Sequence, residues 1–409
     1  MVTDFQAVVL GADLGVYALC RSLNDAYGII PTVIAQDQLG PIANSKILSY
    51  RSVPDSADPA ELLKVLEEVA AQSAGPRLLL VNSDWYVEFI TQNREVLAQW
   101  YALPYPEDVV RAAVSDKARF AELCAQHGID SPRTHVLEFD DAGAPDITEL
   151  DFTYPLIAKA SSSAAWQAVT FPQKRKVYEI SSAQELQEEL GHIQAAGFRD
   201  RFLIQEMIPG DDTQMRSVTA YVDQSGAVNL LCTAWVLLEE HTPSGLGNPA
   251  AMFTYEDAEL AAQAEKFLTA VNYRGFANFD VKIDPRTGKL NFLEVNPRIG
   301  RNNYYVTASG INPMRHVVQD AVFNEPLPRA DEFQENLYSI VPTRLLTRYL
   351  VDKGLKRRVL RLARAGKLVN PLSNPKDRNF QRQKYVALAK INQVVKFLKH
   401  YPRPSGTGF

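Results

Sequence analysis

Short apolar runs alternate with helical patterns in the N-terminal part of the chain. Residues 7–10, 32–35 and 78–81 are apolar and are bounded by turn-forming or polar residues, which predicts three strands. Residues 16–27 carry apolar side chains at helical spacing between the first two strands. Strands that alternate with helices are typical of a parallel sheet, so we expect an α/β domain over residues 1–114.

The turn after the first strand reads Gly-Ala-Asp-Leu-Gly over residues 11–15. It matches half of a dinucleotide-binding fingerprint, whose full form needs a third glycine at a fixed spacing. A tight turn from strand to helix explains both glycines without a ligand. We prefer that interpretation to an NAD-dependent enzyme.

After the first domain the pattern changes to strands and hairpins with a few helices. Ser115 or Asp116 is suited to cap the first of these helices, because a short polar side chain accepts from the free N–H groups of the first turn. Ser181 or Ser182 is suited to cap another, and each has a Gln or Glu three residues on. The last 70 residues are helical in pattern and are interrupted by glycines and prolines.

Residues 276–301 carry the most informative pattern in the chain. Phe279 and Val281 alternate with polar residues, a turn follows, and Leu293 and Val295 alternate on the return. Pairing the apolar positions places Phe279 opposite Val295. The same pairing places Val281 opposite Leu293, so we expect an antiparallel hairpin.

This register gathers oxygen-bearing side chains on the polar face of the hairpin. Asp280 comes to lie opposite Glu294, and Asn278 opposite Asn296. Two facing carboxylates repel unless a cation lies between them, and Asn296 adds a neutral oxygen on the same face. Oxygen ligands without sulfur or imidazole favour Mg²⁺, whose other ligands are usually water and phosphate. We therefore predict a magnesium site at Asp280, Glu294 and Asn296.

A solvated polar face is the alternative interpretation of this hairpin. Arg298 and Arg301 follow directly after the return strand. Guanidinium groups suit an anionic phosphate or carboxylate. Their position next to the acidic pair favours a binding site over a solvated surface.

Composition narrows the class of protein. Charged residues make up 22% and hydrophobic residues 46% of the 409 residues, as in soluble globular proteins. The three cysteines lie far apart and no histidine motif occurs, so neither a disulfide framework nor a transition-metal site is expected. The N-terminus lacks a signal-peptide pattern and no apolar run has the length of a membrane span, which predicts a cytoplasmic protein.

Charge is divided unevenly along the chain, whose net charge is −5. Residues 344–409 hold 17 lysines and arginines against two acids, a net charge of +15, whereas the preceding 343 residues carry −20. Such a split indicates that one part of the chain faces something anionic. The candidates are a soluble anion, anionic lipid and the acidic remainder of the chain. Nucleic acid is not expected, because no basic motif interleaved with aromatic residues occurs.

Further elements stand in the order found in one enzyme superfamily. Lys117 lies in the first turn of a predicted helix, and Lys159 ends a short apolar strand. A strand over residues 202–210 breaks at Pro-Gly and is followed by Asp212. Together with the acidic hairpin, these pieces resemble the ATP-grasp superfamily over roughly residues 115–315.

The resemblance implies a fold and a set of roles. The implied fold is α/β (α+β), with a Rossmann-like pre-ATP-grasp domain over residues 1–114, a two-lobed ATP-grasp domain over residues 115–325 and a basic helical segment over residues 326–409. The ligands are ATP and Mg²⁺. The implied contacts are Lys117 and Lys159 with the phosphates, Glu206 and the Ile208 backbone with adenine, Asp212 with ribose, Asp280, Glu294 and Asn296 with Mg²⁺, and Arg298 and Arg301 with the reacting acyl phosphate.

The loop expected over the phosphates departs from the family pattern. It is normally rich in glycine, but here it begins with Ser161, Ser162 and Ser163. Serine hydroxyls and backbone amides can hold phosphate, although this backbone is less permissive than a glycine loop. An ordinary serine-rich turn is the alternative interpretation.

The reaction of the family explains why such groups are needed. A carboxylate repels nucleophiles through its own charge. Transfer of the ATP γ-phosphoryl group makes an acyl phosphate, which an amine attacks with release of phosphate. Cations offset the charge as the two anions approach, and positioning supplies much of the rate. The resemblance therefore implies an ADP-forming ligase that makes a C–N bond.

Three segments resemble a narrower group, the D-aspartate ligases of peptidoglycan synthesis. They are residues 239–249, residues 300–313, and the serine loop together with residues 174–178. This resemblance implies that the β-carboxylate of D-aspartate joins the side-chain amine of a UDP-muramoyl pentapeptide. The basic segment would then attract this anionic precursor or make weak peripheral contact with a membrane.

The free carboxylate of such a donor needs cationic partners. The candidates are Arg216, His241, Arg298 and Arg301. Two alternatives are kept: an amino-acid or dipeptide ligase with a small acceptor, and an ATP-binding regulatory module without turnover. The sequence leaves the oligomeric state open.

Overall fold

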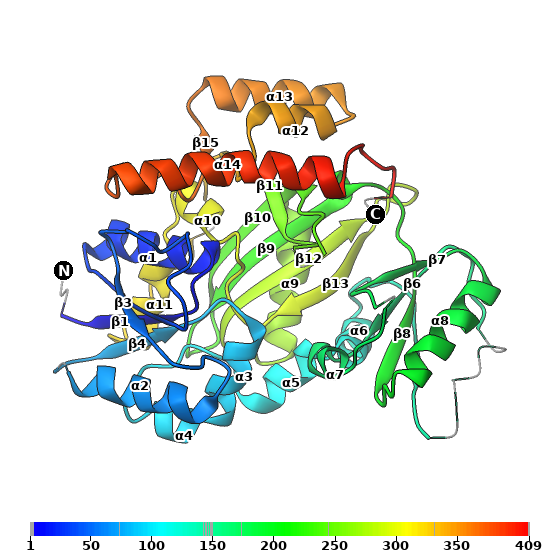
Figure 1. Cartoon of the computed structure of the whole chain (residues 1–409), viewed down its shortest axis with the longest axis horizontal. Helices are drawn as coiled ribbons and strands as arrows, with labels where there is room; N and C mark the ends of the chain where they lie inside the picture. Colours follow the sequence, from blue (N-terminus) through cyan, green and yellow to red (C-terminus); the bar gives the residue numbers. More distant parts are fainter. Residues whose placement is uncertain are drawn as a thin grey trace.

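The computed structural model describes residues 4–72, 74–141, 143, 145, 147, 150–172, 174–243, 245–330 and 332–407 (Figure 1). Helices and sheets are both present, in the mixed α/β class predicted from the sequence. Three sheets organise this part of the chain. Among the described residues, no helix combines the length and apolarity needed to cross a membrane. The three cysteines are buried and free, as expected.

The N-terminal domain is built on a four-stranded parallel sheet. Its elements are β1 (Gln6–Leu10), α1 (Leu14–Tyr27), β2 (Thr32–Ala35), β3 (Ser49–Ser52), α2 (Pro59–Ala71), β4 (Arg77–Leu80), α3 (Asp84–Gln92), α4 (Arg94–Leu97) and α5 (Asp108–Ser115). The strand order is β3-β2-β1-β4. Alternate residues of β1 serve two cores, because successive side chains of a strand point to opposite faces. Val9 packs with α1, and Val8 packs with α2 and α3.

The turn from β1 to α1 explains one of its glycines by a close approach. A Cβ added to Gly15 would lie 2.9 Å from the Arg301 Cα and 2.1 Å from the Asn82 Nδ2. Asp13 caps α1 by accepting from the Val16 N–H at 3.0 Å. Gly15 therefore serves a tight turn in contact with a distant part of the chain, as the preferred interpretation predicted.

A small antiparallel sheet forms one lobe of the central part of the chain. Its elements are α6 (Lys117–Gln126), β5 (Thr134–Glu138), β6 (Leu156–Ala160), α7 (Ser163–Ala168), β7 (Tyr178–Ile180), α8 (Ala183–Ala195) and β8 (Arg201–Glu206). The strand order is β5-β8-β6-β7. Trp166 packs against the rings of Tyr178, Phe198 and Phe202, which gives this lobe its own core.

The two predicted helix starts have the expected caps. Asp116 accepts from the Arg119 N–H at 2.8 Å and caps α6. Ser182 accepts from the Glu185 N–H at 3.2 Å and caps α8. The cap at Asp116 makes Lys117 the first residue of α6.

A seven-stranded sheet forms the other lobe. Its strands and their helices are η1 (Asp212–Gln214), β9 (Met215–Val222), β10 (Val228–Glu239), β11 (Pro249–Thr254), α9 (Ala258–Ala270), β12 (Gly275–Ile283), β13 (Leu290–Asn296), α10 (Tyr304–Ala308), α11 (Pro313–Ala321), β14 (Leu337–Ser339) and β15 (Leu368–Val369). The strand order is β13-β12-β9-β10-β11-β14-β15. Helix α9 packs on one face through Leu260 and Phe267, whereas α1, α10 and α11 share the core of the other face.

The predicted acidic hairpin is formed by β12 and β13. Asp280 pairs with Glu294. Asn278 pairs with Asn296, so both polar pairs stand in the predicted register. The two carboxylates are therefore neighbours across one strand pair.

One apolar pair of the hairpin differs from the prediction. Phe279 pairs with Val295 as expected, but Val281 pairs with Phe292. The expected pair of Val281 with Leu293 is wrong, because the register shifts by one residue after the acidic pair. Leu293 is the extra residue of this bulge, and it lines the cavity described below.

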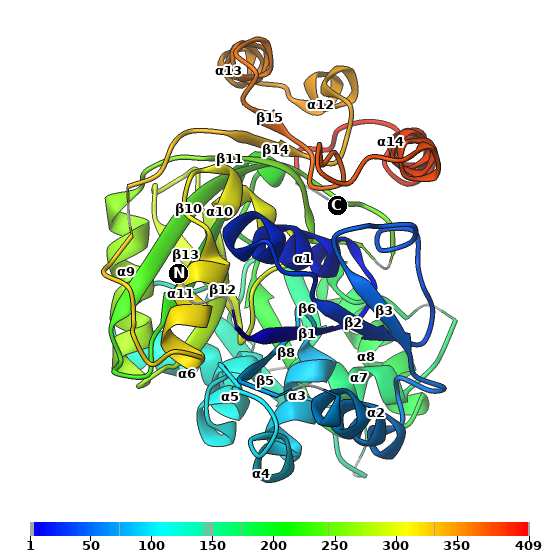
Figure 2. The same cartoon turned by 90° about the vertical axis from the view of Figure 1, so that its left-hand side faces the viewer.

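The C-terminal segment is mainly helical, with α12 (Thr343–Tyr349), α13 (Lys353–Arg364) and α14 (Phe380–His400). The expectation of a purely helical segment needs one correction, because β14 and β15 extend the large sheet. Figures 1 and 2 show α12, α13 and α14 as an outer layer, in which α14 runs from the N-terminal domain towards the large sheet.

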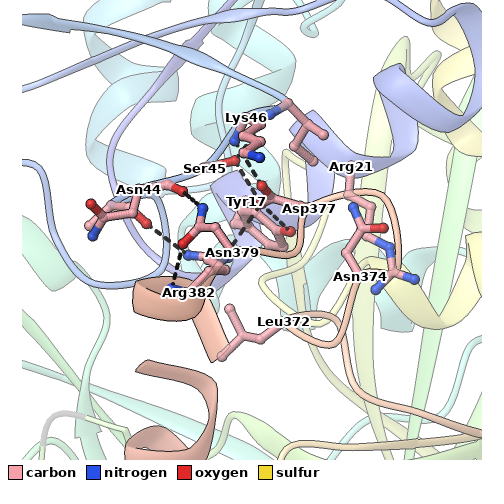
Figure 3. Close-up of polar contacts among 12 residues, drawn as sticks. Tyr17, Arg21, Asn44, Ser45, Lys46, Leu372, Asn374, Asp377, Asn379 and Arg382 are labelled. Atoms are coloured by element: carbon pink, nitrogen blue, oxygen red, sulfur yellow. Dashed lines mark hydrogen bonds and ion pairs between the residues drawn. The ribbon is translucent and has the colours of Figure 1, made fainter. Parts of the chain in front are cut away.

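A buried polar cluster joins this layer to the N-terminal domain (Figure 3). Asp377 accepts from the Tyr17 hydroxyl at 2.9 Å, the Ser45 hydroxyl at 2.8 Å and the Lys46 N–H at 2.7 Å. Arg382, 1% exposed, forms an ion pair with Asp377 at 3.5 Å and lies 4.1 Å from the centre of the Tyr17 ring. The cluster fixes the start of α14 against α1.

Candidate active site

A cavity of about 510 Å³ lies between the small sheet and the large sheet. Its wall takes side chains from α6, β6, β8, β10 and the β12–β13 hairpin. Seven of the residues predicted for the site line it: Lys117, Lys159, Glu206, Ile208, Asp212, Asp280 and Glu294. The fold thus gathers the residues predicted for phosphate, adenine, ribose and metal around one volume.

Asp280 and Glu294 face each other at the cavity wall. Burial and the adjacent Glu294 charge raise the pKa of Asp280 to about 8. Burial opposes ionisation of Glu294 as well, but the charges of Lys117 and Lys159 outweigh it and lower the pKa of Glu294 to about 2. The pair shares one negative charge at neutral pH, and a divalent cation between the carboxylates would let both ionise.

Three lysines approach the cavity from the small lobe. Lys117 begins α6, Lys159 lies on β6, and Lys176 precedes β7. Burial and the charge of Lys117 lower the pKa of Lys159 to about 8. Neighbouring cations of this kind are stabilised by an anion, and a polyphosphate carries enough negative charge for all three. Lys176 lies in the segment 174–178 but was not assigned to the site from the sequence.

The connection between the two lobes follows β8. Glu206 ends β8, and Ile208 lies two residues further on. Arg286, in the turn between β12 and β13, forms ion pairs with Glu206 at 3.0 Å and with Asp284 at 2.7 Å. This contact joins the two lobes beside the position predicted for adenine.

The C-terminal segment reaches the same cavity. Asp212 accepts from the Glu239 N–H at 2.9 Å and hydrogen-bonds the His241 Nε2 at 3.0 Å. The imidazole of His241 stacks on Tyr401, with ring centroids 3.6 Å apart. Thr407 itself lines the cavity. His241, predicted as a donor contact, therefore connects Asp212 to the C-terminal segment, and this connection had no signal in the sequence.

Two more cavity residues were not singled out from the sequence. Glu239 ends β10, and Lys282 follows Asp280 by two positions on β12. Burial and the charge of Asp212 raise the pKa of Glu239 to about 8, and burial lowers the pKa of Lys282. The period of two in a strand could have identified Lys282, because it shares the face of Asp280.

Asn296 and Arg298 lie at the edge of the acidic pair. The Asn296 amide donates to Asp280 Oδ2 at 3.4 Å and accepts from Arg298 Nη2 at 3.3 Å. Arg298 also donates to Asp84, the first residue of α3, at 2.9 Å. The charge of Arg298 acts against the rise in the pKa of Asp280. Arg298 therefore connects the predicted metal residues to the N-terminal domain.

Arg301 makes a second connection to the N-terminal domain. It forms an ion pair with Glu240, which follows β10, and another with Asp13 at 3.2 Å. Asp13 belongs to the turn that caps α1. The predicted catalytic arginine is thus held between the large sheet and the glycine-containing turn.

Arg216 packs inside the large lobe among aromatic rings. Its guanidinium lies 4.0 Å from the centre of the Trp235 ring, and its Nε donates to the Tyr255 hydroxyl at 2.8 Å. It also donates to the Thr213 carbonyl at 3.0 Å. These partners account for its position without a contact to a donor molecule.

The serine loop uses its first two hydroxyls within the protein. Ser161 is buried and donates to Asp116 Oδ2 at 2.8 Å, which joins β6 to the start of α6. Ser162 caps α7 by accepting from the Ala165 N–H at 3.2 Å. Ser163 is the first residue of α7, and its side chain lies outside the described part of the structure. The geometry at the first two positions favours the serine-rich turn.

Comparisons with known proteins decide the family. Residues 116–312 match the family model described as "Carbamoyl-phosphate synthase L chain, ATP binding domain". The chain belongs to the ATP-grasp ligases. The prediction of an ADP-forming ligase that makes a C–N bond is confirmed at this level.

The ligase has relatives with related chemistry. It is 29% identical over 408 residues to a D-aspartate ligase of Enterococcus faecium, and the match covers 97% of each chain. An L-amino acid ligase from Bacillus licheniformis has the same fold, with a TM-score of 0.57 and 15% identity over 80% of this chain and 75% of that chain. So does the biotin carboxylase domain of the Hydrogenobacter thermophilus 2-oxoglutarate carboxylase, solved with MgADP, with a TM-score of 0.60 and 15% identity over 81% and 72% of the two chains.

The donor set of the ligase suits a hard cation that keeps part of its hydration. No group of three or more His, Cys, Asp and Glu side chains is arranged for a metal ion in the part of the chain that the structure describes. Two carboxylates and the Asn296 amide leave coordination positions for water and phosphate oxygens. Mg²⁺ is commonly bound in this way, by one or two carboxylates together with the phosphates of a nucleotide.

Proposed function

We propose that the ligase binds ATP with Mg²⁺ in the cavity between its lobes and activates a carboxylate as an acyl phosphate. One observation carries this proposal: the Asp280–Glu294 pair faces three lysines around a single cavity. Opposite charges in this arrangement match a polyphosphate bridged to the protein by a divalent cation.

The remaining roles follow the position of each side chain at the cavity. Lys117, Lys159 and Lys176 contact the phosphates from the small lobe. Glu206 and the Ile208 backbone border adenine at the connection between the lobes. The buried Asp212 contacts the ribose hydroxyls, and His241 and Tyr401 keep its carboxylate in place.

Asp280, Glu294 and Asn296 would hold Mg²⁺. When bound, the ion neutralises charge on the β- and γ-phosphates. The Asn296 amide must exchange its bond to Arg298 for the ion, and this exchange would leave the guanidinium available to an oxygen of the acyl phosphate. Arg301, held by Glu240 and Asp13, stands next to it for the donor.

The reaction then follows from these contacts. A carboxylate oxygen of the donor attacks the γ-phosphorus, the bond to the β,γ-bridging oxygen breaks, and ADP leaves. The acceptor amine attacks the carbonyl carbon of the acyl phosphate. The bond between that carbon and the phosphate oxygen breaks, phosphate leaves, and the amine loses a proton. The products are an amide, ADP and phosphate.

We further propose D-aspartate as the donor, through its β-carboxylate, and the side-chain amine of a UDP-muramoyl pentapeptide as the acceptor. The similarity to a D-aspartate ligase over 97% of both chains supports this choice. A dicarboxylic donor also gives Arg298 and Arg301 a second carboxylate to bind. ATP and this precursor occur together in the cytoplasm, where we place the ligase.

The experiment that tests the proposal is phosphate release with ATP and Mg²⁺, across amino acids of both chiralities, with and without the UDP-muramoyl pentapeptide. Release that requires D-aspartate and the pentapeptide together is the expected result. The L-amino acid ligase of the same fold suggests a second candidate, and release with pairs of L-amino acids would support it instead. Absence of release with every pair would indicate a regulatory module and contradict the proposal.

A further inference from the structure

Helix α14 exposes an apolar stripe to solvent. Leu388, Ile391, Val395 and Leu398 are 52%, 59%, 55% and 47% exposed. Their spacing of three and four residues places them on one face of the helix. Phe380, which is 82% exposed, lies five turns before Leu398 on the same face. Single exposed apolar residues are ordinary on a protein surface, but a stripe along a whole helix indicates a partner.

The helix that carries this stripe is basic and contains no acidic residue. Its five cations are Arg382, Lys384, Lys390, Lys396 and Lys399. Lys384 is exposed one turn before Leu388, within the stripe, and Lys399 is exposed beside Leu398. The apolar and the positive side chains therefore occupy one outward surface.

The rest of the C-terminal segment adds to this positive surface. Helix α13 exposes basic side chains around a buried apolar face, and α12, α13 and α14 belong to the same outer layer (Figure 2). In the described part of the chain, ion pairs with acidic side chains involve four of the 17 cations of residues 344–409. Packing on the acidic remainder of the chain therefore accounts for a minority of the charge.

The combination of charge and apolar surface selects one kind of partner. A second copy of the chain would cover the stripe, but it would bring two segments of net charge +15 together. A soluble anion would satisfy the charge and leave the aliphatic side chains in water. The surface of an anionic lipid bilayer accepts both, because aliphatic side chains enter the headgroup boundary while lysines contact the headgroups.

We propose that α14 docks the ligase on anionic membrane surfaces, with Leu388, Ile391, Val395 and Leu398 inserted at the headgroup boundary. The lysines of α14 and α13 contact the phosphates of the lipid. The contact is peripheral, since no helix among the described residues has the properties of a membrane span. It is separate from the cavity and does not depend on which carboxylate or amine the ligase uses.

Flotation of the full-length protein with vesicles tests this proposal. The vesicles contain either phosphatidylcholine alone or phosphatidylcholine with phosphatidylglycerol, at low and at high salt. We expect binding to the anionic vesicles only, and weaker binding at high salt. Absence of binding to the anionic vesicles at low salt would overturn the proposal.

Two pairs of variants separate the stripe from general electrostatics. Replacing Leu388, Ile391 and Val395 together with Gln should lower the partition coefficient at least about tenfold, because the apolar insertion is lost. Val109→Gln, at an 82% exposed position on α5, should leave it unchanged. Combined replacement of Lys384 and Lys399 with Gln should weaken binding mainly at low salt, whereas Lys64→Gln, exposed on α2, should not.

The same variants expose the competing explanations. Full vesicle binding by the triple Gln variant would show that the stripe has no part in docking. A concentration-dependent dimer in sedimentation that the triple variant abolishes, without vesicle binding by the wild type, would assign the stripe to a second copy. Either result overturns the proposal. All the replaced side chains are exposed, so unchanged thermal unfolding is expected and serves as the control for folding.

Discussion

Lys159 illustrates how the cavity adjusts a single side chain. Burial and the nearby Lys117 lower its pKa to about 8, although the Glu294 carboxylate opposes this shift. Below that pH the ammonium group is charged and can bind phosphate. In the unliganded protein the sign for stability is the opposite: the unfolded chain keeps the proton up to the ordinary lysine pKa of 10.5, so the free energy of unfolding rises with pH between the two values.

ATP affinity should therefore follow the protonation of Lys159. We expect the affinity to weaken about tenfold between about pH 7 and about pH 9, because the free protein loses this charge near the middle of that range. Calorimetric titration with a non-hydrolysable ATP analogue measures the effect. Lys159→Met should bind weakly at every pH, whereas Lys64→Met should keep the wild-type pH dependence. A Lys159→Met variant with the wild-type slope would contradict this assignment.

At the scale of residues, the sequence predicted those contacts that strand pairing dictates. Asp280 stands opposite Glu294 because apolar alternation sets the register. The bulge at Leu293 was missed, because alternation alone does not encode an extra residue. The ion pair of Arg301 with Asp13 was not predictable either, since it joins two domains far apart in sequence.

At the scale of elements, the end of α14 contributes to the nucleotide cavity. Tyr401 directly follows α14, stacks on His241 and so supports the bond between His241 and Asp212. The sequence predicted the helix but not this contact, because a stacking partner 160 residues away depends on how the outer layer packs. The strands, helices and caps near the cavity were predictable, because short-range patterns determine them.

Removal of the Tyr401 ring should impair nucleotide binding more than turnover. We expect Tyr401→Ala to raise the KM for ATP about tenfold with a small change in kcat, because Asp212 loses its orientation while the reacting groups stay in place. Tyr401→Phe keeps the stacked ring and should behave like the wild type. Equal losses of kcat in both variants would indicate a general structural role and contradict this interpretation.

At the scale of the whole molecule, the buried cluster around Asp377 joins the first and last parts of the chain. Asp377 and Arg382 are both buried, and the pair contacts Tyr17, Ser45 and Lys46 of the N-terminal domain. The sequence indicated three parts and a basic C-terminal segment. It did not indicate that one Asp–Arg pair inside that segment is its anchor, because both residues look like ordinary surface charges in a polar stretch.

Breaking this buried pair on one side should destabilise the protein strongly. We expect Asp377→Asn to lower the free energy of unfolding by about 3 to 5 kcal/mol, because the Arg382 charge is left buried without its partner. The double variant with Arg382→Gln should lose less than the sum of the two single variants. Chemical denaturation measures both effects. Additive losses in the double variant would mean that the two residues do not act as a pair.

The most direct test of the account is the dependence of ATP affinity on Mg²⁺ in Glu294→Gln. Titration calorimetry of the wild type should show ATP binding that Mg²⁺ strengthens at least about tenfold, since the ion neutralises the acidic pair. Glu294→Gln should remain folded and lose this dependence, whereas Glu67→Gln, exposed on α2, should keep it. If Glu294→Gln retained the full effect of Mg²⁺ on ATP binding, the metal site at the β12–β13 hairpin would be contradicted.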